Sequence, residues 1–464
     1  MLVVLTVVLV SLRVSASLSA KPFHYDISQD LDLENATYHS VFSDLLPFFG
    51  LGRGISLIET NVAEGLFGPP PYPLRSKSSP RQAYDYVIVG GGSAGCVLAG
   101  RLSEDPDVTV LIIEAGGEES GFSALPLSAL FLRKSKRDWG FETAMQATAA
   151  RGLRGQAVPV PQGKCIGGGS AINGMIYSRG NPRDYDRWAE LGAENWSWAD
   201  VFPYFVKSES KILDKRYQSE YHGTRGPLTV STPVDPLPTD ILYFEGIKEA
   251  GLNFGDYNGD DQARFNYADF TIRNGTRCST ARAYLGPAYG RPNLDIMLNS
   301  EASRVIFDNK RAFGVMFERE NKMHVVRARK EVIISAGTYN TPKLLMLSGI
   351  GARNELQKHG IPVLVDLPGV GHNLQDHVHT LMPYSTKPKT SVVYTRIDQT
   401  AEAALRFVRN RTGIFTLPAS EVIGFYRTPA ARDERPDIEV HQTSVLLGGA
   451  FPNPLLGKTP DQNS

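Results

Sequence analysis

The stretch that decides the fold of this chain is Asp85-Tyr-Val-Ile-Val89-Gly90-Gly-Gly92-Ser-Ala-Gly95. Its first five residues form a short apolar run bounded by glycine, which predicts a buried parallel strand. The run passes directly into a complete G-x-G-x-x-G. Residues 96–102 then carry apolar side chains at helical spacing, and a second apolar run at 108–113 predicts another buried strand. A strand, a glycine fingerprint, a helix and a second strand in this order predict a dinucleotide-binding unit.

Each part of the fingerprint has a physical task. Gly90 permits the tight turn, Gly92 lets the backbone approach a pyrophosphate, and Gly95 lets the helix pack on the strand. The free N–H groups and the dipole at the helix N-terminus favour phosphate charge. Glu114 ends the second strand, 19 residues beyond Gly95, where it can accept hydrogen bonds from ribose hydroxyls. The alternative is a glycine-rich turn with a structural glutamate. The motif alone does not separate FAD from NAD.

The composition narrows the class of protein. The chain has 464 residues, 42% of them apolar and 21% charged, which excludes a disordered, collagen-like or disulfide-stapled chain. Lys and Arg together number 49, as do Asp and Glu, so no overall field attracts nucleic acid and we expect no nucleic-acid partner. The three cysteines (Cys96, Cys165 and Cys278) suggest buried thiols rather than a disulfide framework or a zinc site, and we predict no metal.

The N-terminal segment predicts export. Residues 1–12 are almost wholly apolar and too few to cross a bilayer, and small residues follow Arg13. This is typical of a secretory signal peptide, residues 1–20, although a buried N-terminal strand is the alternative. Residues 21–80, with a Pro-rich stretch at 68–73, are interpreted as a leader or linker. No later segment reaches membrane-spanning length, so we expect a secreted, extracellular protein without a membrane span.

Four Asn-x-Ser/Thr triplets, compatible with glycosylation in a secreted protein, lie at Asn35, Asn195, Asn274 and Asn410.

Two further glycine-rich segments interrupt the chain. In residues 161–177, three consecutive glycines are followed by Asn173, so bare backbone and an amide could approach a flat or charged ligand. The alternative is a structural loop at a domain junction. In residues 331–351, a buried strand leads to a helix that we predict to be capped by Thr341, with Pro342 at its first position, and to end at Gly349. This predicts another strand–helix unit of the same sheet.

Together these segments resemble a known family. Residues 163–177, Gly-Lys-Cys-Ile-Gly-Gly-Gly-Ser-Ala-Ile-Asn-Gly-Met-Ile-Tyr, with Gly180 and Asp186 beyond them, match the first pattern of the glucose–methanol–choline (GMC) oxidoreductases. Residues 335–351 match the second pattern, and residues 138–142 and 370–377 also look like family segments. The resemblance covers roughly residues 80 to 440. It is closest to insect-type, secreted, FAD-dependent glucose dehydrogenases that pass electrons to a quinone.

The resemblance implies an α/β fold with a Rossmann-like FAD-binding domain and a second, α+β substrate domain built on an antiparallel sheet. The FAD-binding domain would be discontinuous, comprising residues 81–190 and 291–378. The substrate domain would comprise residues 191–290 and 379–464 and lack its C-terminal part. Residues 311–333 alternate apolar and polar side chains around a polar turn at 320–322, which fits a β-meander leading back to the FAD sheet.

The resemblance also implies site residues and chemistry. The pyrophosphate would lie along Gly90, Gly92, Ser93 and Gly95, the adenosine ribose at Glu114, the adenine at the backbone of Ala302, and the flavin side at Gly168, Asn173 and Met175. Members of the family oxidise the CH–OH group of an alcohol or sugar by hydride transfer to the flavin, with a histidine taking the hydroxyl proton. The implied partners are a small alcohol or sugar and, as electron acceptor, a quinone or oxygen.

The chain departs from the family pattern near its C-terminus. None of its nine histidines is followed by proline, and neither a His-Pro nor an Asn-Thr-Asn-Ala-Pro segment, which carry the family's catalytic residues, is present. We therefore assign no catalytic residue and expect an incomplete product of an oxidoreductase gene that is inactive as written. The alternatives are a secreted, non-catalytic, truncated isoform that binds FAD or another ligand, and an enzyme that uses another dinucleotide such as a nicotinamide.

Overall fold

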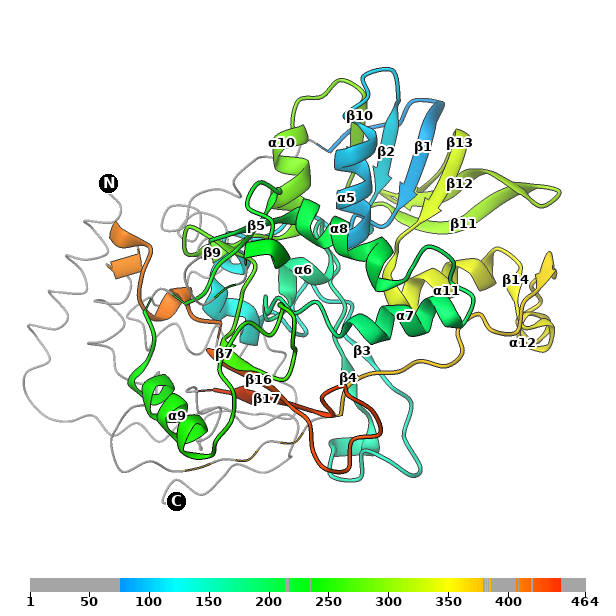
Figure 1. The fold of residues 1–464 in the computed structure, drawn as a ribbon. Helices are drawn as coiled ribbons and strands as arrows, with labels where there is room; N and C mark the ends of the chain where they lie inside the picture. Colours follow the sequence, from blue (N-terminus) through cyan, green and yellow to red (C-terminus); the bar gives the residue numbers. More distant parts are fainter. Residues whose placement is uncertain are drawn as a thin grey trace, which may run out of the picture.

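The computed structural model describes residues 76–443, apart from 213–216, 218, 234, 379, 381, 383, 385–405, 408 and 419 (Figure 1). The predicted signal peptide, and the leader up to residue 75, lie outside the described residues.

A six-stranded sheet forms the larger part of the fold. Its strand order is β10-β2-β1-β13-β12-β11. The strands are β1 (Ala83–Val89), β2 (Val110–Ile113), β10 (Leu294–Met297), β11 (Glu301–Asp308), β12 (Arg311–Arg319) and β13 (Lys322–Ile334). The pairs β10–β2, β2–β1 and β1–β13 are parallel, whereas β13–β12 and β12–β11 are antiparallel. The sheet is therefore mixed, and the predicted α/β fold with a Rossmann-like dinucleotide-binding unit is confirmed.

One long strand joins the two parts of this sheet. The 13-residue strand β13 pairs through Lys322–Arg327 with β12 and through Arg327–Ile334 with β1. The turn between β12 and β13 has positive φ at Glu320 and Asn321, the backbone that a two-residue hairpin requires. The predicted meander and its polar turn are thus confirmed.

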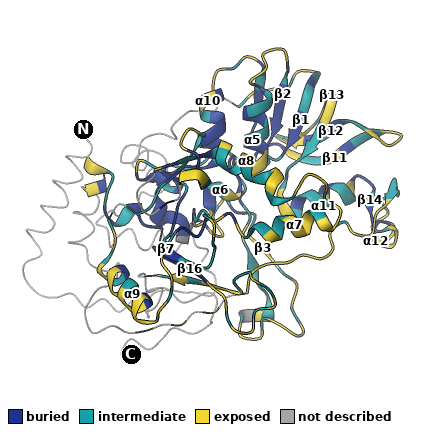
Figure 2. Cartoon of the chain, viewed as in Figure 1, coloured by how far each residue is buried: buried dark blue, intermediate teal, exposed yellow. Residues whose placement is uncertain are grey.

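Both faces of β1, β2 and β10 are largely buried, whereas β13 is mostly exposed or partly exposed (Figure 2). On one face, Ile88, Val110 and Ile112 pack with Cys96 and Leu285, so helix α5 (Ser93–Leu102) covers them. The opposite face is covered by side chains of the meander and of helix α11 (Gly337–Leu347): Val87, Val89, Leu111 and Ile113 pack there with Val305, Val315, Phe317 and Leu344. Burial on both sides explains why these strands are continuous apolar runs.

The start of α11 differs from the sequence prediction. The helix begins at Gly337, with Ala336 as N-cap, and Pro342 lies inside it rather than at its first position. The positive φ of Gly337 lets the chain turn into the helix immediately after β13. The predicted stop is confirmed, because Ser348 caps the helix and Gly349 has a φ of +89°.

A second, antiparallel sheet of three strands has the order β17-β16-β7 and lies below the first in Figure 1. Its strands are β7 (Phe265–Tyr267), β16 (Val422–Tyr426) and β17 (Ile438–Gln442). The other α-helices within the described residues are α6 (Gly169–Ile172), α7 (Pro182–Glu190), α8 (Trp198–Ser208), α9 (Pro238–Glu249), α10 (Gly286–Ala288) and α12 (Arg353–Lys358).

Short strands and turns complete the described fold. The two-stranded sheets pair β3 (Phe141–Glu142) with β4 (Pro159–Val160), β5 (Glu209–Lys211) with β6 (Leu228–Val230), β8 (Ile272–Arg273) with β9 (Thr276–Arg277), and β14 (Ile350–Gly351) with β15 (Val365–Asp366). A π-helical turn, η7 (Ala281–Leu285), packs against α5, and 3₁₀ turns lie at Phe122–Ala124, Pro126–Phe131, Arg154–Gln156, Ser219–Tyr221 and Ile414–Thr416.

The three cysteines are free and buried, as predicted. No helix in the described part of the chain combines the length and apolar character that a membrane-spanning helix needs. The described residues also contain no group of three or more His, Cys, Asp or Glu side chains placed to hold a metal ion.

Candidate cofactor site

The three glycine-rich segments found in the sequence meet in space. We call residues 90–95, 163–169 and 335–337 together the glycine junction. The Gly167 amide donates a hydrogen bond of 2.8 Å to the Gly91 carbonyl, which joins the second segment to the fingerprint. The Ser335 hydroxyl donates to the Gly90 carbonyl at 2.9 Å, which joins the third segment to the fingerprint. Three stretches separated by up to 245 positions therefore form one backbone surface.

The close packing of the glycine junction requires residues that have no side chain. A Cβ on Gly95 would lie 2.0 Å from the Gly90 carbonyl oxygen, and a Cβ on Gly90 would lie 2.6 Å from the Ser335 carbonyl oxygen. A Cβ on Gly168 would lie 2.7 Å from Gly92 Cα. Gly90 and Gly168 also have φ values of +96° and +52°. Only glycine allows these backbones to come so close.

On its open side the junction presents the N-terminus of α5. The N-cap, Gly92, provides no side-chain hydrogen bond, the first turn has no acidic residue, and Ser93 is exposed. The first N–H groups of a helix need acceptors, and the helix dipole favours a negative charge there. A Cβ on Gly169 would meet nothing within 4 Å, so the backbone beside this helix end is open as well. The arrangement fits a pyrophosphate lying over bare backbone.

Glu114 lies immediately after β2. One of its carboxylate oxygens accepts the Gly91 amide and the other accepts the Gly116 amide, each at 2.8 Å. The residue is 5% exposed, and burial raises the pKa of its carboxyl to about 7 although both amide bonds favour the ionised form. Each oxygen keeps a second lone pair with which to accept a hydroxyl. The carboxylate therefore suits the ribose contact predicted from the sequence.

Ala302 lies close to the same corner of the sheet. It is on β11, opposite Phe317 of β12, and is partly buried against the core of the meander. Two residues before it, the Ser300 amide donates to the Glu114 carbonyl at 2.8 Å. The predicted adenine contact thus falls beside the end of the strand that carries the predicted ribose contact.

The predicted flavin-side residues divide into two kinds. Asn173 is exposed at the end of α6, and its Oδ1 accepts the Met175 amide at 3.1 Å and Arg277 Nη1 at 2.9 Å. The side chain of Met175 is fully buried among apolar residues that include Phe270 and Ile423. The Met175 side chain therefore packs in the core next to the second sheet, so its predicted place along the flavin side concerns its backbone.

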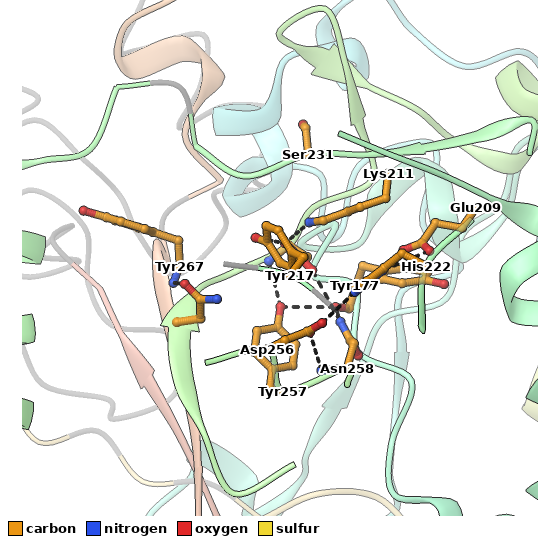
Figure 3. Close-up of polar contacts among 12 residues, drawn as sticks. Tyr177, Glu209, Lys211, Tyr217, His222, Ser231, Asp256, Tyr257, Asn258 and Tyr267 are labelled. Atoms are coloured by element: carbon orange, nitrogen blue, oxygen red, sulfur yellow. Dashed lines mark hydrogen bonds and ion pairs between the residues drawn. The ribbon is translucent and has the colours of Figure 1, made fainter. Parts of the chain in front are cut away.

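A buried ionic network, which the sequence analysis did not predict, lies beside Tyr177, at the end of the 161–177 segment (Figure 3). His222 bonds Asp256 through Nε2 at 2.8 Å and Glu209 through Nδ1 at 3.1 Å. Glu209 also pairs with Arg179 at 2.7 Å, and Lys211 pairs with Asp269. Burial disfavours the charged imidazole, but the bonds to Asp256 and Glu209 outweigh it and raise the pKa of His222 to about 9.

The network contains three basic side chains and three carboxylates, and all six are buried. They are Arg179, Lys211, His222, Glu209, Asp256 and Asp269. Arg179 belongs to it two residues after Tyr177, whose carbonyl accepts Tyr257 Oη and Asn258 Nδ2 at 3.3 Å each. The network therefore anchors the end of the 161–177 segment rather than offering groups to a ligand.

The six histidines that the structure describes lie away from the glycine junction or are held by other groups. His222 is in the ionic network, His324 stacks on Phe317, and His359 and His441 bond Glu355 and Glu439. His372 and His377 lie in an exposed segment after β15. The sequence interpretation gave no catalytic role to any of them, and these positions give none of them a contact with the junction.

A comparison with known proteins identifies the family. A sequence model of the GMC oxidoreductases matches residues 84–379. The chain is 40% identical over 372 residues to an alcohol dehydrogenase [acceptor] of Pseudomonas putida, covering 78% of this chain and 66% of that one. It is also 40% identical over 367 residues to an oxygen-dependent choline dehydrogenase of Brucella anthropi, covering 78% and 65%.

Comparison with solved structures gives the same result for the fold. An FAD-dependent oxidoreductase from Chaetomium thermophilum superposes with a TM-score of 0.66 at 33% identity, covering 74% of this chain and 61% of that chain. The corresponding values for pyridoxine 4-oxidase from Mesorbium loti are 0.64, 30%, 78% and 66%. This chain belongs to the GMC oxidoreductase family, which confirms the resemblance at that level. It spans about two thirds of the length of the relatives named here.

Proposed function

We propose that the glycine junction binds FAD and that the protein acts as an oxidoreductase on the CH–OH group of an alcohol or sugar. The observation that carries the proposal is the meeting of three glycine segments around the uncapped N-terminus of α5, with Glu114 at the end of β2. The cofactor is FAD: the chain belongs to the GMC family, and its structural neighbours include an FAD-dependent oxidoreductase.

The residues divide the work of holding the cofactor. The α5 amides at Gly92 and Ser93 bind the pyrophosphate, and the Glu114 carboxylate accepts the ribose hydroxyls. The backbone near Ala302 lies beside the adenine. Gly168 keeps the second segment against the fingerprint, and Asn173 presents its amide to the flavin. When bound, FAD supplies the hydride acceptor, and the protein orients the carbon that reacts.

The substrate we propose is a small alcohol or sugar, with a quinone or oxygen as electron acceptor. An alcohol dehydrogenase and an oxygen-dependent choline dehydrogenase among the relatives support the alcohol class. The finer assignment, to secreted glucose dehydrogenases that pass electrons to a quinone, rests on the sequence resemblance of residues 80–440.

A second candidate, FAD binding without turnover, is favoured by the positions of the histidines. Proton removal from the alcohol requires a base within hydrogen-bond reach of the hydroxyl. None of the six described histidines contacts the junction. We infer that the described residues hold the cofactor without supplying this base. Because the sequence contains neither a His-Pro nor an Asn-Thr-Asn-Ala-Pro segment, we also infer that the chain as written does not reduce a dye with alcohol.

The test uses the purified 464-residue chain. We expect a flavin absorption band after incubation with FAD and gel filtration, and no bleaching of that band by a panel of sugars and primary alcohols. Alcohol-dependent dye reduction would contradict the inference that the chain supplies no catalytic base, but it would be consistent with the proposed cofactor site. A chain that elutes without flavin would contradict the cofactor site itself.

Export is the last part of the proposal. It rests on the apolar residues 1–12 and on the sequons. The three sequon asparagines within the described residues, Asn195, Asn274 and Asn410, are all exposed and so are accessible for glycosylation. Expression in a secreting eukaryotic cell should deliver the chain to the medium with a glycosidase-sensitive mobility. Retention in the cytosol without glycans would contradict export.

A further inference from the structure

The segment that carries Asn173 has little stability of its own. Helix α6 has only four residues, and an isolated turn of this length is unstable in water. It is preceded by Gly167 and Gly168, whose φ values of +86° and +52° belong to the region that glycine enters most easily. The carbonyls at its C-terminal end also lack partners within the helix. Something outside the segment must fix its conformation.

Arg277 of β9 supplies those contacts. Its Nη1 donates to the Ser170 carbonyl at 3.1 Å, to the Asn173 carbonyl at 2.8 Å and to Asn173 Oδ1 at 2.9 Å. Its Nε donates to the Ser123 carbonyl at 2.8 Å, so the guanidinium is anchored on its other side. A cation at a helix C-terminus also interacts favourably with the helix dipole. The residue is only 2% exposed.

A second residue of the same turn holds the start of α6. The Thr280 amide donates to Ser170 Oγ at 3.0 Å, and the two hydroxyl oxygens are also 3.0 Å apart. Residues 277–280 therefore hold the α6 segment at both of its ends. At the Asn173 end, one guanidinium group donates to both the carbonyl and the side-chain oxygen of Asn173.

The contacts also determine which way the Asn173 amide faces. Its Oδ1 already accepts two donors, the Met175 amide and Arg277 Nη1. An amide group carries its acceptor and its donors on opposite arms, so Nδ2 is directed away from Arg277. Asn173 is exposed, and Nδ2 is thus presented outward as a hydrogen-bond donor.

We propose that Arg277 is a positioning residue for the cofactor: it fixes the Ser170–Asn173 turn and orients the Asn173 amide as a donor toward the flavin. The inference rests on the proposed FAD site. It adds to that site a residue that never touches the cofactor and acts through Asn173.

The test is a double-mutant cycle on FAD affinity, measured by quenching of flavin fluorescence on the full-length chain. We expect Arg277→Met and Asn173→Ala each to weaken FAD binding by on the order of ten-fold, since each removes hydrogen bonds of a charged or positioned group. If Arg277 acts through Asn173, the double variant should be little weaker than either single one. Arg277→Lys keeps the positive charge but lacks the several donors of the planar guanidinium, so it should retain only part of the wild-type affinity for FAD.

The matched control is Arg273→Met, on the neighbouring strand of the same hairpin. Arg273 donates through Nε to Thr229 Oγ1 at 2.9 Å and also donates to the Pro227 carbonyl, so its side chain bonds residues at β6 and none in α6. We expect its FAD affinity to stay within two-fold of wild type. The visible band of bound flavin should change shape in Arg277→Met and not in Arg273→Met. Thermal unfolding of the cofactor-free variants shows whether each remains folded.

Two results would overturn the proposal while leaving the FAD site intact: wild-type affinity in Arg277→Met, or additive losses in the double variant. If Arg277→Met does not fold, the FAD affinity of Asn173→Asp tests the proposal instead. This variant keeps the acceptor for Arg277 but removes the outward donor, so it must weaken FAD binding without lowering the unfolding midpoint. Unchanged affinity in Asn173→Asp would overturn the proposal. A wild-type chain that binds no FAD would overturn the proposed function as well.

Discussion

Replacing Gly168 by alanine should separate two of the three segments of the glycine junction. The new Cβ would lie 2.7 Å from Gly92 Cα, closer than real Cβ contacts come, and its neighbour is backbone, which cannot rotate aside. The φ of +52° combined with a ψ of −128° is also a backbone conformation that alanine rarely adopts. Such backbone strain costs about 1–3 kcal/mol, and overpacking a tight contact costs about 1–3 kcal/mol more.

The sum, about 2–6 kcal/mol, is a large part of the roughly 5–15 kcal/mol that stabilises a typical domain. Gly168→Ala should therefore lower the unfolding midpoint of the cofactor-free chain in urea by a clear margin. It should also weaken FAD binding at least ten-fold, since about 1.4 kcal/mol corresponds to a factor of ten.

The control is the next residue. Gly169 is exposed, and a Cβ there meets nothing within 4 Å. Gly169→Ala should leave the free energy of unfolding within about 0.5 kcal/mol of wild type, as an unconstrained surface change does. If Gly168→Ala and Gly169→Ala behaved alike in urea, the close approach of the two backbones would not be a feature of the protein in solution.

Further predictions concern ionisation and reactivity. Burial raises the pKa of Glu114 from 4.5 to about 7, so the free energy of unfolding of the cofactor-free chain should fall by about 3 kcal/mol as the pH rises from 4.5 to 7 and above. Glu114→Gln should flatten the pH dependence of the unfolding midpoint. An unchanged slope would contradict the raised pKa of Glu114. The pKa of His222 is raised from 6.5 to about 9, so its stabilising charge is fully present below pH 6.5 and is lost as pH rises through 9. His222→Gln should cost about 3 kcal/mol near pH 6.5, because it leaves buried Asp256 without its cationic partner, and clearly less at pH 9.5, as urea unfolding at the two pH values would show. Cys96, Cys165 and Cys278 are all buried, so none should react with a thiol reagent until the chain unfolds; rapid labelling of the native chain would contradict this.

The sequence predicted the dinucleotide-binding unit because its signals are local. The apolar run before Gly90, the glycine spacing and the second apolar run are continuous in the chain, and each determines backbone geometry within a few residues. The polar turn at 320–322 was predictable for the same reason. The second strand is two residues shorter than predicted, since β2 starts at Val110 and the Val108 amide instead bonds the Asp105 carbonyl in a turn.

The start of α11 shows how a local signal can be overridden. Thr341 followed by Pro342 is a common helix start, because proline has no N–H to leave unpaired at the first position. Here the strand ends at Ile334 and Gly337 turns the chain at once, so the helix has already begun when Pro342 is reached. Contact between residues 335–336 and the fingerprint determines this, and no window of sequence around Thr341 contains that information.

The roles of Arg277 and of the ionic network of His222 could not be predicted from the sequence, for a different reason. The partners of Arg277 are separated from it by 104 to 154 positions, and those of His222 by 13 and 34. Neither arginine nor histidine at these positions belongs to a periodic pattern that marks burial. The only available sign was that Arg277 stands beside Cys278, in a run whose small residues permit close packing.

The most direct test of the account is the visible absorption spectrum of the purified chain, before and after incubation with FAD and gel filtration. If the glycine junction binds FAD, a flavin band co-elutes with the protein and is lost in Gly168→Ala but kept in Gly169→Ala. A folded chain that never retains flavin would contradict the claim that the glycine junction is a cofactor site.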